Sequence, residues 1–179
     1  MVRIETERLI IRDNTESDLD DHHRLISDQE IMSYLSDIHT HSLEESKKNL
    51  KFSIDESQKK DDRSCYFFAM LDKKDNTYIG AIGLTLLDQN EIGGNAELGY
   101  FILKEFWNKG YTTEAAKAVI SFGFNKLKIH KISTGCALEN TRSENIMKKL
   151  GMEKEAHLKK HVCHNNEWKD RVEYALFKE

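Results

Sequence analysis

The chain has 179 residues, of which 39% are hydrophobic and 32% are charged, and its formal charge is −4. This composition predicts a single folded domain over residues 1–179, and the acidic balance argues against a general nucleic-acid binder. No apolar run reaches the roughly 18 residues that a membrane helix needs, and Cys65, Cys136 and Cys163 form no C-x-x-C pair, so we expect a cytoplasmic protein with no membrane partner, disulfide framework or thiolate zinc site.

The first 94 residues predict one strand, two helices, a hairpin and a polar loop. The first helix is short, amphipathic and rich in acids, and the second begins with a capping box formed by Ser42 and Glu45. A turn-like stretch separates the two apolar arms of the hairpin. The predicted bounds are 8–12 for the strand, 14–26 and 43–54 for the helices, 66–71 and 77–87 for the hairpin arms, and 88–94 for the loop.

Residues 97–126 carry a strand, a loop and a helix around which the other elements are arranged. The strand, residues 97–103, has apolar side chains on both faces, which is typical of an internal strand covered on two sides. The short connection Asn108-Lys109-Gly110-Tyr111 leads into the helix, and Thr112 or Thr113 is expected to be its N-cap. The connection between this strand and the N-terminus of the helix therefore contains a glycine, Gly110.

The last third of the chain predicts a strand, a short helix and two further strands. Ser143 is expected to cap this helix, and Gly151 to end it. The pair Asn165-Asn166 tolerates a left-handed turn between the last two strands. The predicted strands are 131–138, 157–164 and 171–177.

The start of the helix after Gly110 is a candidate anion site. The first amides of a helix have no internal partners, and the helix dipole favours negative charge there. Gly110 permits close approach and Lys109 adds a positive charge, which favours a phosphate or pyrophosphate ligand. The alternative is a plain strand-to-helix turn, in which the glycine only relieves a left-handed backbone.

Three motifs, found together in one order, resemble the GCN5-related N-acetyltransferases (GNAT), and in particular the ribosomal-protein alanine acetyltransferases RimJ and RimL. They are TERLIIR at 6–12, WNKGYTTEA at 107–115, and ENTRSENIMKKLGM at 139–152 followed by NNEWKD at 165–170. The resemblance covers the whole chain and implies a three-layer α+β fold, with a mixed, mostly antiparallel sheet of about seven strands and helices on both faces. The chain departs from the family at Thr112, where Ala or Gly is usual, and at Lys104, where relatives often have proline.

The resemblance implies acetyl-CoA as the co-substrate and assigns residues to it. The pantetheine arm would pair with the backbone of Phe101, Ile102 and Leu103. Asn140 would donate its amide to a pantetheine carbonyl, while the hydroxyl of Ser143 would face the sulfur. The residues whose loop would hold the pyrophosphate of coenzyme A are Asn108, Lys109, Gly110, Tyr111, Thr112 and Thr113.

Acetyl transfer needs a base for the amine and a proton for the leaving thiolate. Glu97 on the central strand is the candidate base, acting directly or through water. The alternative is an acid that orders the strand edge or pairs with a basic residue. Many relatives protonate the thiolate with a tyrosine one turn after the serine, but Met147 stands there, so Ser143 or water would be the donor. The alternative for Ser143 is a simple helix cap.

The resemblance implies direct attack of a primary amine on the thioester, with a protein N-terminal amine as the acceptor. The alternatives are a small-molecule amine, such as a polyamine, amino acid or antibiotic, and a non-catalytic module that holds acyl-CoA. Acids from Asp13 to Glu30 would either draw in a cationic acceptor or form a solvated face. No metal is expected, because His164 leaves the strand face that His157, His161 and Cys163 share. Relatives often dimerise, so a homodimer is possible.

Overall fold

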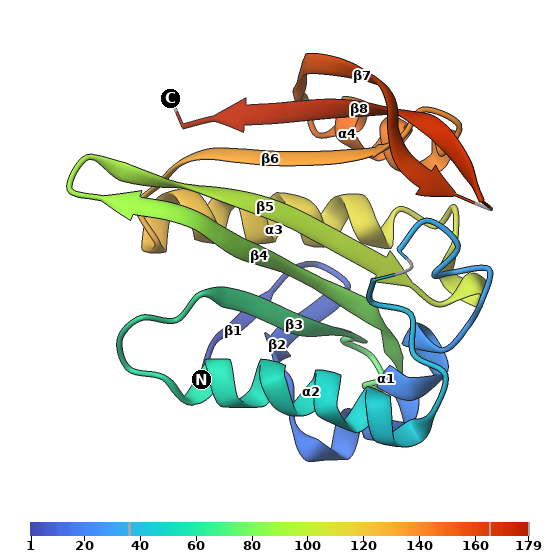
Figure 1. The fold of residues 1–179 in the computed structure, drawn as a ribbon. Coiled ribbons are helices and arrows are strands. Elements are labelled where there is room, and N and C mark those ends of the chain that lie inside the picture. Colours follow the sequence, from blue (N-terminus) through green and yellow to red (C-terminus); the bar gives the residue numbers. More distant parts are fainter. Residues whose placement is uncertain (36, 165, 179) are drawn as a thin grey trace.

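The computed structural model describes residues 1–35, 37–164 and 166–178. In these residues eight strands form one sheet in the order β1-β2-β3-β4-β5-β6-β8-β7 (Figure 1), and only the β5–β6 pair is parallel. The strands are β1 (Arg3–Glu5), β2 (Leu9–Asp13), β3 (Cys65–Asp72), β4 (Tyr78–Asn90), β5 (Gly93–Ile102), β6 (Ile129–Ala137), β7 (Glu153–His164) and β8 (Glu167–Phe177). The helical elements are η1 (Glu16–Asp18), α1 (Leu19–Ile26), α2 (Leu43–Gln58), η2 (Lys104–Phe106), α3 (Tyr111–Lys126) and α4 (Thr141–Lys149).

The predicted α+β fold is confirmed, and all seven predicted strands are present. The additional strand is β1, which pairs with β2. The predicted loop at 88–94 is wrong: β4 continues to Asn90 and β5 begins at Gly93, so a two-residue connection closes a long hairpin. The sequence of this part predicts a loop because the end of the hairpin is exposed and its residues are therefore polar. Asn166 has a φ of 60°, as expected of the last turn, while Asn165 lies outside the described residues.

Helices cover the two faces of the sheet, and each face has its own core. On one face, Leu84 and Leu98 of the sheet pack with Val119 of α3. On the other face, the core contains Leu25 of α1 and Ala81 of β4. Figure 1 shows the same layering, with α3 behind the strands and α2 in front of them. Alternate side chains of β5 therefore enter different layers, because successive residues of a strand point to opposite faces.

Strands β5 and β6 are paired over only part of their length. The pairing runs from Gly94 with Ile129 to Glu97 with Ser133. Beyond it, within the described ranges, β5 pairs only with β4, and β6 pairs only with β8. The two strands thus present backbone edges to each other that no strand of the described chain fills. Such edges are able to pair with an extended ligand.

A buried carboxylate holds the end of α2 against the start of β3. Glu56 is 3% exposed, forms an ion pair with Lys59, and accepts hydrogen bonds from the amide and the hydroxyl of Ser64 at 2.7 and 2.9 Å. Burial alone would raise the pKa of Glu56, but these donors outweigh it and lower the pKa from an ordinary 4.5 to about 2. The charged form of Glu56 therefore stabilises the folded protein.

Replacement of Glu56 by Gln is expected to lower the free energy of unfolding at neutral pH by about 1 kcal/mol. The folded pKa is depressed, so the wild type keeps this contribution above pH 4.5 and loses it as the pH falls from 4.5 to about 2. Urea unfolding at several pH values measures both effects. Asp55→Asn, which removes an exposed carboxylate paired with Lys51, is the matched control. Equal acid sensitivity in Glu56→Gln and wild type would contradict this expectation.

Candidate active site

Helix α3 begins at a left-handed glycine. Gly110 has a φ of +82° and is the N-cap, so the helix starts at Tyr111. The predicted caps, Thr112 and Thr113, are wrong, because both lie in the first turn of the helix. A side chain at this φ would strain the backbone, so the turn itself requires glycine. Thr112 is buried, which withdraws its bulk from the solvent-facing side of the loop.

The first amides of α3 are uncapped. The first bond of the helix runs from the amide of Glu114 to the carbonyl of Gly110, at 3.1 Å. Among the described residues, the amides of residues 111–113 meet no hydrogen-bond acceptor, and no side chain caps them. Uncapped amides at the positive end of a helix dipole favour an anion. The backbone at this helix start therefore suits an anion such as a diphosphate as the hydrogen-bond acceptor of these amides.

Two arginines from distant parts of the sequence contact the loop that precedes this helix. Arg8 donates to the carbonyl of Lys109 at 3.0 Å and also pairs with Glu114. The guanidinium of Arg142, from α4, lies 4.1 Å from the ring of Trp107. The sequence prediction included Lys109 but missed both arginines. Both arginines lie within the recognised motifs, Arg8 in TERLIIR and Arg142 in ENTRSENIMKKLGM. The local sequence, however, does not indicate that the two side chains contact the same loop.

The free edge of β5 carries the backbone groups of alternate residues. The amide of Leu103 already donates to Ile79 of β4, at 2.9 Å. By the alternation of an antiparallel pair, the backbone of Phe101 also faces β4, whereas that of Tyr100 and Ile102 faces the unpaired side. Of the three residues predicted to hold pantetheine, only Ile102 therefore offers its amide there. Its carbonyl is occupied, because it accepts from the indole of Trp107 at 2.9 Å.

Asn140, not Ser143, caps α4. The side-chain oxygen of Asn140 accepts from the amide of Ser143 at 3.2 Å, and the helix begins at Thr141. The predicted capping role of Ser143 is therefore wrong. Its hydroxyl instead lies 2.9 Å from the hydroxyl of Tyr100, which reaches it from β5. The amide nitrogen of Asn140 has no acceptor among the described residues and remains able to donate.

Tyr100 is a residue that the sequence prediction missed. Burial raises the pKa of Tyr100 to about 12, although the hydrogen bond with Ser143 opposes this rise. The phenol therefore stays protonated at neutral pH and is able to donate to Ser143. Met147, at the position of the family tyrosine, is fully buried in the core under α4. The phenol of Tyr100, on β5, thus lies beside Ser143. In the sequence, the one feature that could have identified Tyr100 is its hydroxyl group on an otherwise apolar face of the strand.

Glu97 lies where the β5–β6 pairing ends. Its side chain points to the face of the sheet opposite that of Tyr100. The two residues are three positions apart along the strand, which corresponds to about 10 Å. Its carboxylate is half exposed and lies 3.6 Å from the guanidinium of Arg171. The pairing with a basic residue that was the alternative for this acid is therefore present.

Most of the N-terminal acids are engaged within the protein. Asp13 is fully buried and pairs with Arg63 at 2.7 Å, and Asp18 pairs with Arg12 at the same distance. Asp28 and Glu30 pair with Lys104. The expectation of an attracting or simply solvated face is thus wrong for Asp13 and Asp18, which are buried. Asp28 and Glu30 are paired but remain in contact with solvent. Lys104, which replaces the usual proline, instead ties the segment after α1 to the loop after β5.

The histidines near the last turn have partners of other kinds. His157 lies 2.7 Å from Asp170, and His164 lies 2.8 Å from the carbonyl of Ser33. In the described ranges, no group of three or more His, Cys, Asp or Glu is arranged to hold a metal ion. None of the helices described is both long and apolar enough to cross a membrane.

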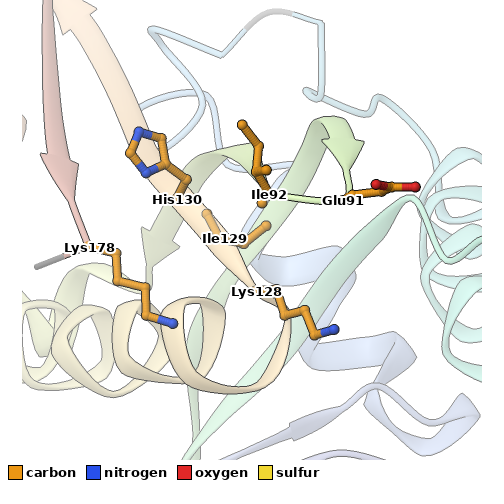
Figure 2. A pocket seen from close by; sticks show the side chains of 7 residues that line it. Glu91, Ile92, Lys128, Ile129, His130 and Lys178 are labelled. Atoms are coloured by element: carbon orange, nitrogen blue, oxygen red, sulfur yellow. The ribbon is translucent and has the colours of Figure 1, made fainter.

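A shallow hollow of about 290 Å³ lies at the opposite end of the β5–β6 pair (Figure 2). Its wall includes Ile92, His130 and Lys178, and the ammonium of Lys178 donates to the carbonyl of Phe124 at 2.8 Å. Gly93 starts β5 here, so the whole length of that strand, about 30 Å, separates the hollow from the loop before α3. It is not part of the candidate site.

Comparison with known proteins identifies the family of this chain. The family model described as acetyltransferase (GNAT) domain matches residues 8–153. The chain is 40% identical over 83 residues to the uncharacterized N-acetyltransferase YnaD of Bacillus subtilis, a match that covers 46% of this chain and 49% of that protein. The chain thus matches only about half the length of this relative.

Solved structures match over nearly the whole chain. An acetyltransferase (GNAT family) from Bacillus anthracis has a TM-score of 0.83 at 29% identity, over 98% of both chains. The spermidine N-acetyltransferase of Vibrio cholerae in complex with CoA and spermine has a TM-score of 0.82 at 24% identity over 96% of both chains, and shows the shared fold alone. Because the family model covers most of the sequence and the fold is common to these structures, the chain belongs to the GNAT acetyltransferase family.

Proposed function

We propose that this chain is a single N-acetyltransferase domain that transfers acetyl from acetyl-CoA to a primary amine, by direct attack of the amine on the thioester. The observation that carries the proposal is the set of uncapped amides at residues 111–113, placed beside the unpaired edges of β5 and β6. The amides fit the diphosphate of coenzyme A, and the free edge of β5 fits its extended arm. When bound, acetyl-CoA supplies the acetyl group.

In this proposal, each residue near the point where β5 and β6 separate has its own role. Asn140 donates its side-chain amide to the arm of the co-substrate, and Ser143 directs its hydroxyl to the sulfur. Tyr100 donates to Ser143, which leaves the hydroxyl hydrogen of the serine free to point away from the phenol. Glu97 receives the amine proton through water.

The acceptor that we favour is the N-terminal amine of a protein. A supporting relative is the ribosomal protein uS5-alanine N-acetyltransferase of Escherichia coli, 29% identical over 116 residues. The second candidate is a polyamine, because the spermidine N(1)-acetyltransferase of the same organism is 28% identical over 92 residues. The two differ chemically, since an N-terminal amine lies next to a peptide carbonyl and a polyamine carries only further cations.

Thiol release from acetyl-CoA tests the proposal across a panel of amines. The panel contains an alanyl peptide, the same peptide with a blocked N-terminus, and spermidine. We expect release with the free peptide and none with the blocked one. A protein that gains thermal stability from coenzyme A but releases no thiol with any amine would be an acyl-CoA-binding module instead.

Glu97→Gln is expected to remove the acidic limb of the rate profile, because the amide has no carboxylate to receive a proton. The measurement is kcat/KM for the amine between pH 5 and 9. Glu105→Gln, at an exposed acid on η2, is the control that should keep the wild-type profile. An acidic limb that persists in Glu97→Gln would assign the base elsewhere.

A further inference from the structure

The sheet has open space above Gly99 of β5. A Cβ added at Gly99 would meet no atom of the described residues within 4 Å, whereas one added at Gly83 of the neighbouring β4 would lie 2.4 Å from a backbone oxygen. Leu98 and Tyr100 pack on the α3 side, so Gly99 faces the opposite side, together with Glu97 and Phe101. The open space therefore lies beside the end of the β5–β6 pairing, on the face away from α3.

An ion-pair cluster borders this space. Gly135 of β6 has no side chain, and a Cβ there would lie 2.4 Å from an oxygen of Glu173 and 2.7 Å from a nitrogen of Arg171. These two side chains of β8 thus lie flat across β6, with 2.5 Å between Arg171 Nε and Glu173 Oε1. Arg171 Nη2 extends towards β5 and is 3.6 Å from Glu97 Oε1. One guanidinium therefore lies between two carboxylates.

The composition of this cluster distinguishes between classes of amine. Two carboxylates attract an ammonium group, and a guanidinium has five N–H donors, of which the two carboxylates engage only part. The remaining donors suit an oxygen that lies one or two bonds from the amine carbon. An α-amine with a neighbouring carbonyl or carboxylate satisfies both groups. A polyamine offers no oxygen, so the remaining N–H donors of Arg171 would find no acceptor on it.

We propose that Arg171, held between Glu97 and Glu173 beside the open space at Gly99, makes the acceptor site selective for α-amines with an adjacent carbonyl or carboxylate oxygen over polyamines. This inference rests on the proposed acetyltransferase function. It narrows the acceptor to the N-terminus of a peptide or a free amino acid. Arg171 acts as a specificity-determining residue, and Glu173 holds its guanidinium in place.

The test is the ratio of kcat/KM values for an alanyl peptide and for spermidine, with free alanine as a third acceptor. The wild type should prefer the peptide or alanine to spermidine, and which of these two it prefers identifies the source of the α-amine. Arg171→Gln should lower kcat/KM for the α-amine about tenfold and leave that for spermidine equal or higher. The matched control is Lys131→Gln, which removes a cation from the same face of β6, where it pairs with Glu155.

A second pair of variants covers the case in which Arg171→Gln folds poorly. Gly99→Val should fill the open space and raise KM for the α-amine about tenfold with unchanged coenzyme A affinity, and Gly99→Ala should have a smaller effect. Unchanged KM in Gly99→Val, a wild-type preference for spermidine, or an Arg171→Gln variant with an unaltered substrate ratio would each overturn the inference. Failure to release thiol with any amine would instead overturn the acetyltransferase function on which it rests.

Discussion

A Ser143→Ala variant is expected to turn over acetyl-CoA about a hundredfold more slowly than the wild type while binding it with unchanged affinity. The hydroxyl of Ser143 is not needed to cap α4, because Asn140 does that through its side chain. It lies 2.9 Å from the phenol of Tyr100, and this contact orients it. The loss should therefore appear in kcat and not in the stability of the helix.

Single-turnover rates and calorimetry with coenzyme A separate the two quantities. Tyr100→Phe should also lower kcat, and the double variant should be no slower than Ser143→Ala alone if the two hydroxyls act as a unit. Because burial raises the pKa of Tyr100 to about 12, no basic limb from this phenol is expected below about pH 10. Ser121→Ala, at an exposed serine of α3, is the control. A normal rate in Ser143→Ala would leave its hydroxyl without a catalytic role.

Gly110→Val is expected to weaken coenzyme A binding by more than tenfold, which corresponds to about 1.4 kcal/mol. Apart from its chain neighbours, the one atom of the described residues within 4 Å of a Cβ at Gly110 would be a nitrogen of Arg8, at 3.5 Å, so there is room for this Cβ within the fold. The methyl groups of valine, however, would lie beside the uncapped amides. The φ of +82° would also be strained for valine, which displaces the start of α3.

A valine at a second left-handed glycine, Gly151, distinguishes the effect of backbone strain from the effect of blocking coenzyme A. Gly151 has a φ of +76°, and its added Cβ would meet no atom of the described chain within 4 Å, so Gly151→Val introduces similar strain away from the loop. Both variants should lose thermal stability, but only Gly110→Val should lose coenzyme A affinity in calorimetry. Equal affinities in the two variants would argue against binding of the diphosphate at this helix start.

Local patterns in the sequence predicted the elements better than their ends. The apolar alternation and the helical spacing identified the strands and helices, because these periodicities are properties of neighbouring residues. The caps were wrong at both helices of the site. Threonine and serine are good N-caps in general, yet the N-cap of α3 is Gly110 and the N-cap of α4 is Asn140. Several residues in each loop are able to act as the N-cap. The position at which the chain leaves the preceding strand decides which of them does so.

The sequence by itself determined the family motifs and the loop at Gly110, since each is encoded within a short stretch. It determined the layers of the fold only through the order of those motifs along the whole chain, by resemblance to the family. Only the tertiary structure decided which amides are free, that Tyr100 meets Ser143, and that Arg171 lies beside Glu97. These contacts join residues far apart in the chain, and strand register sets them: a shift of one residue in β5 would turn Tyr100 and Glu97 to the opposite faces of the sheet.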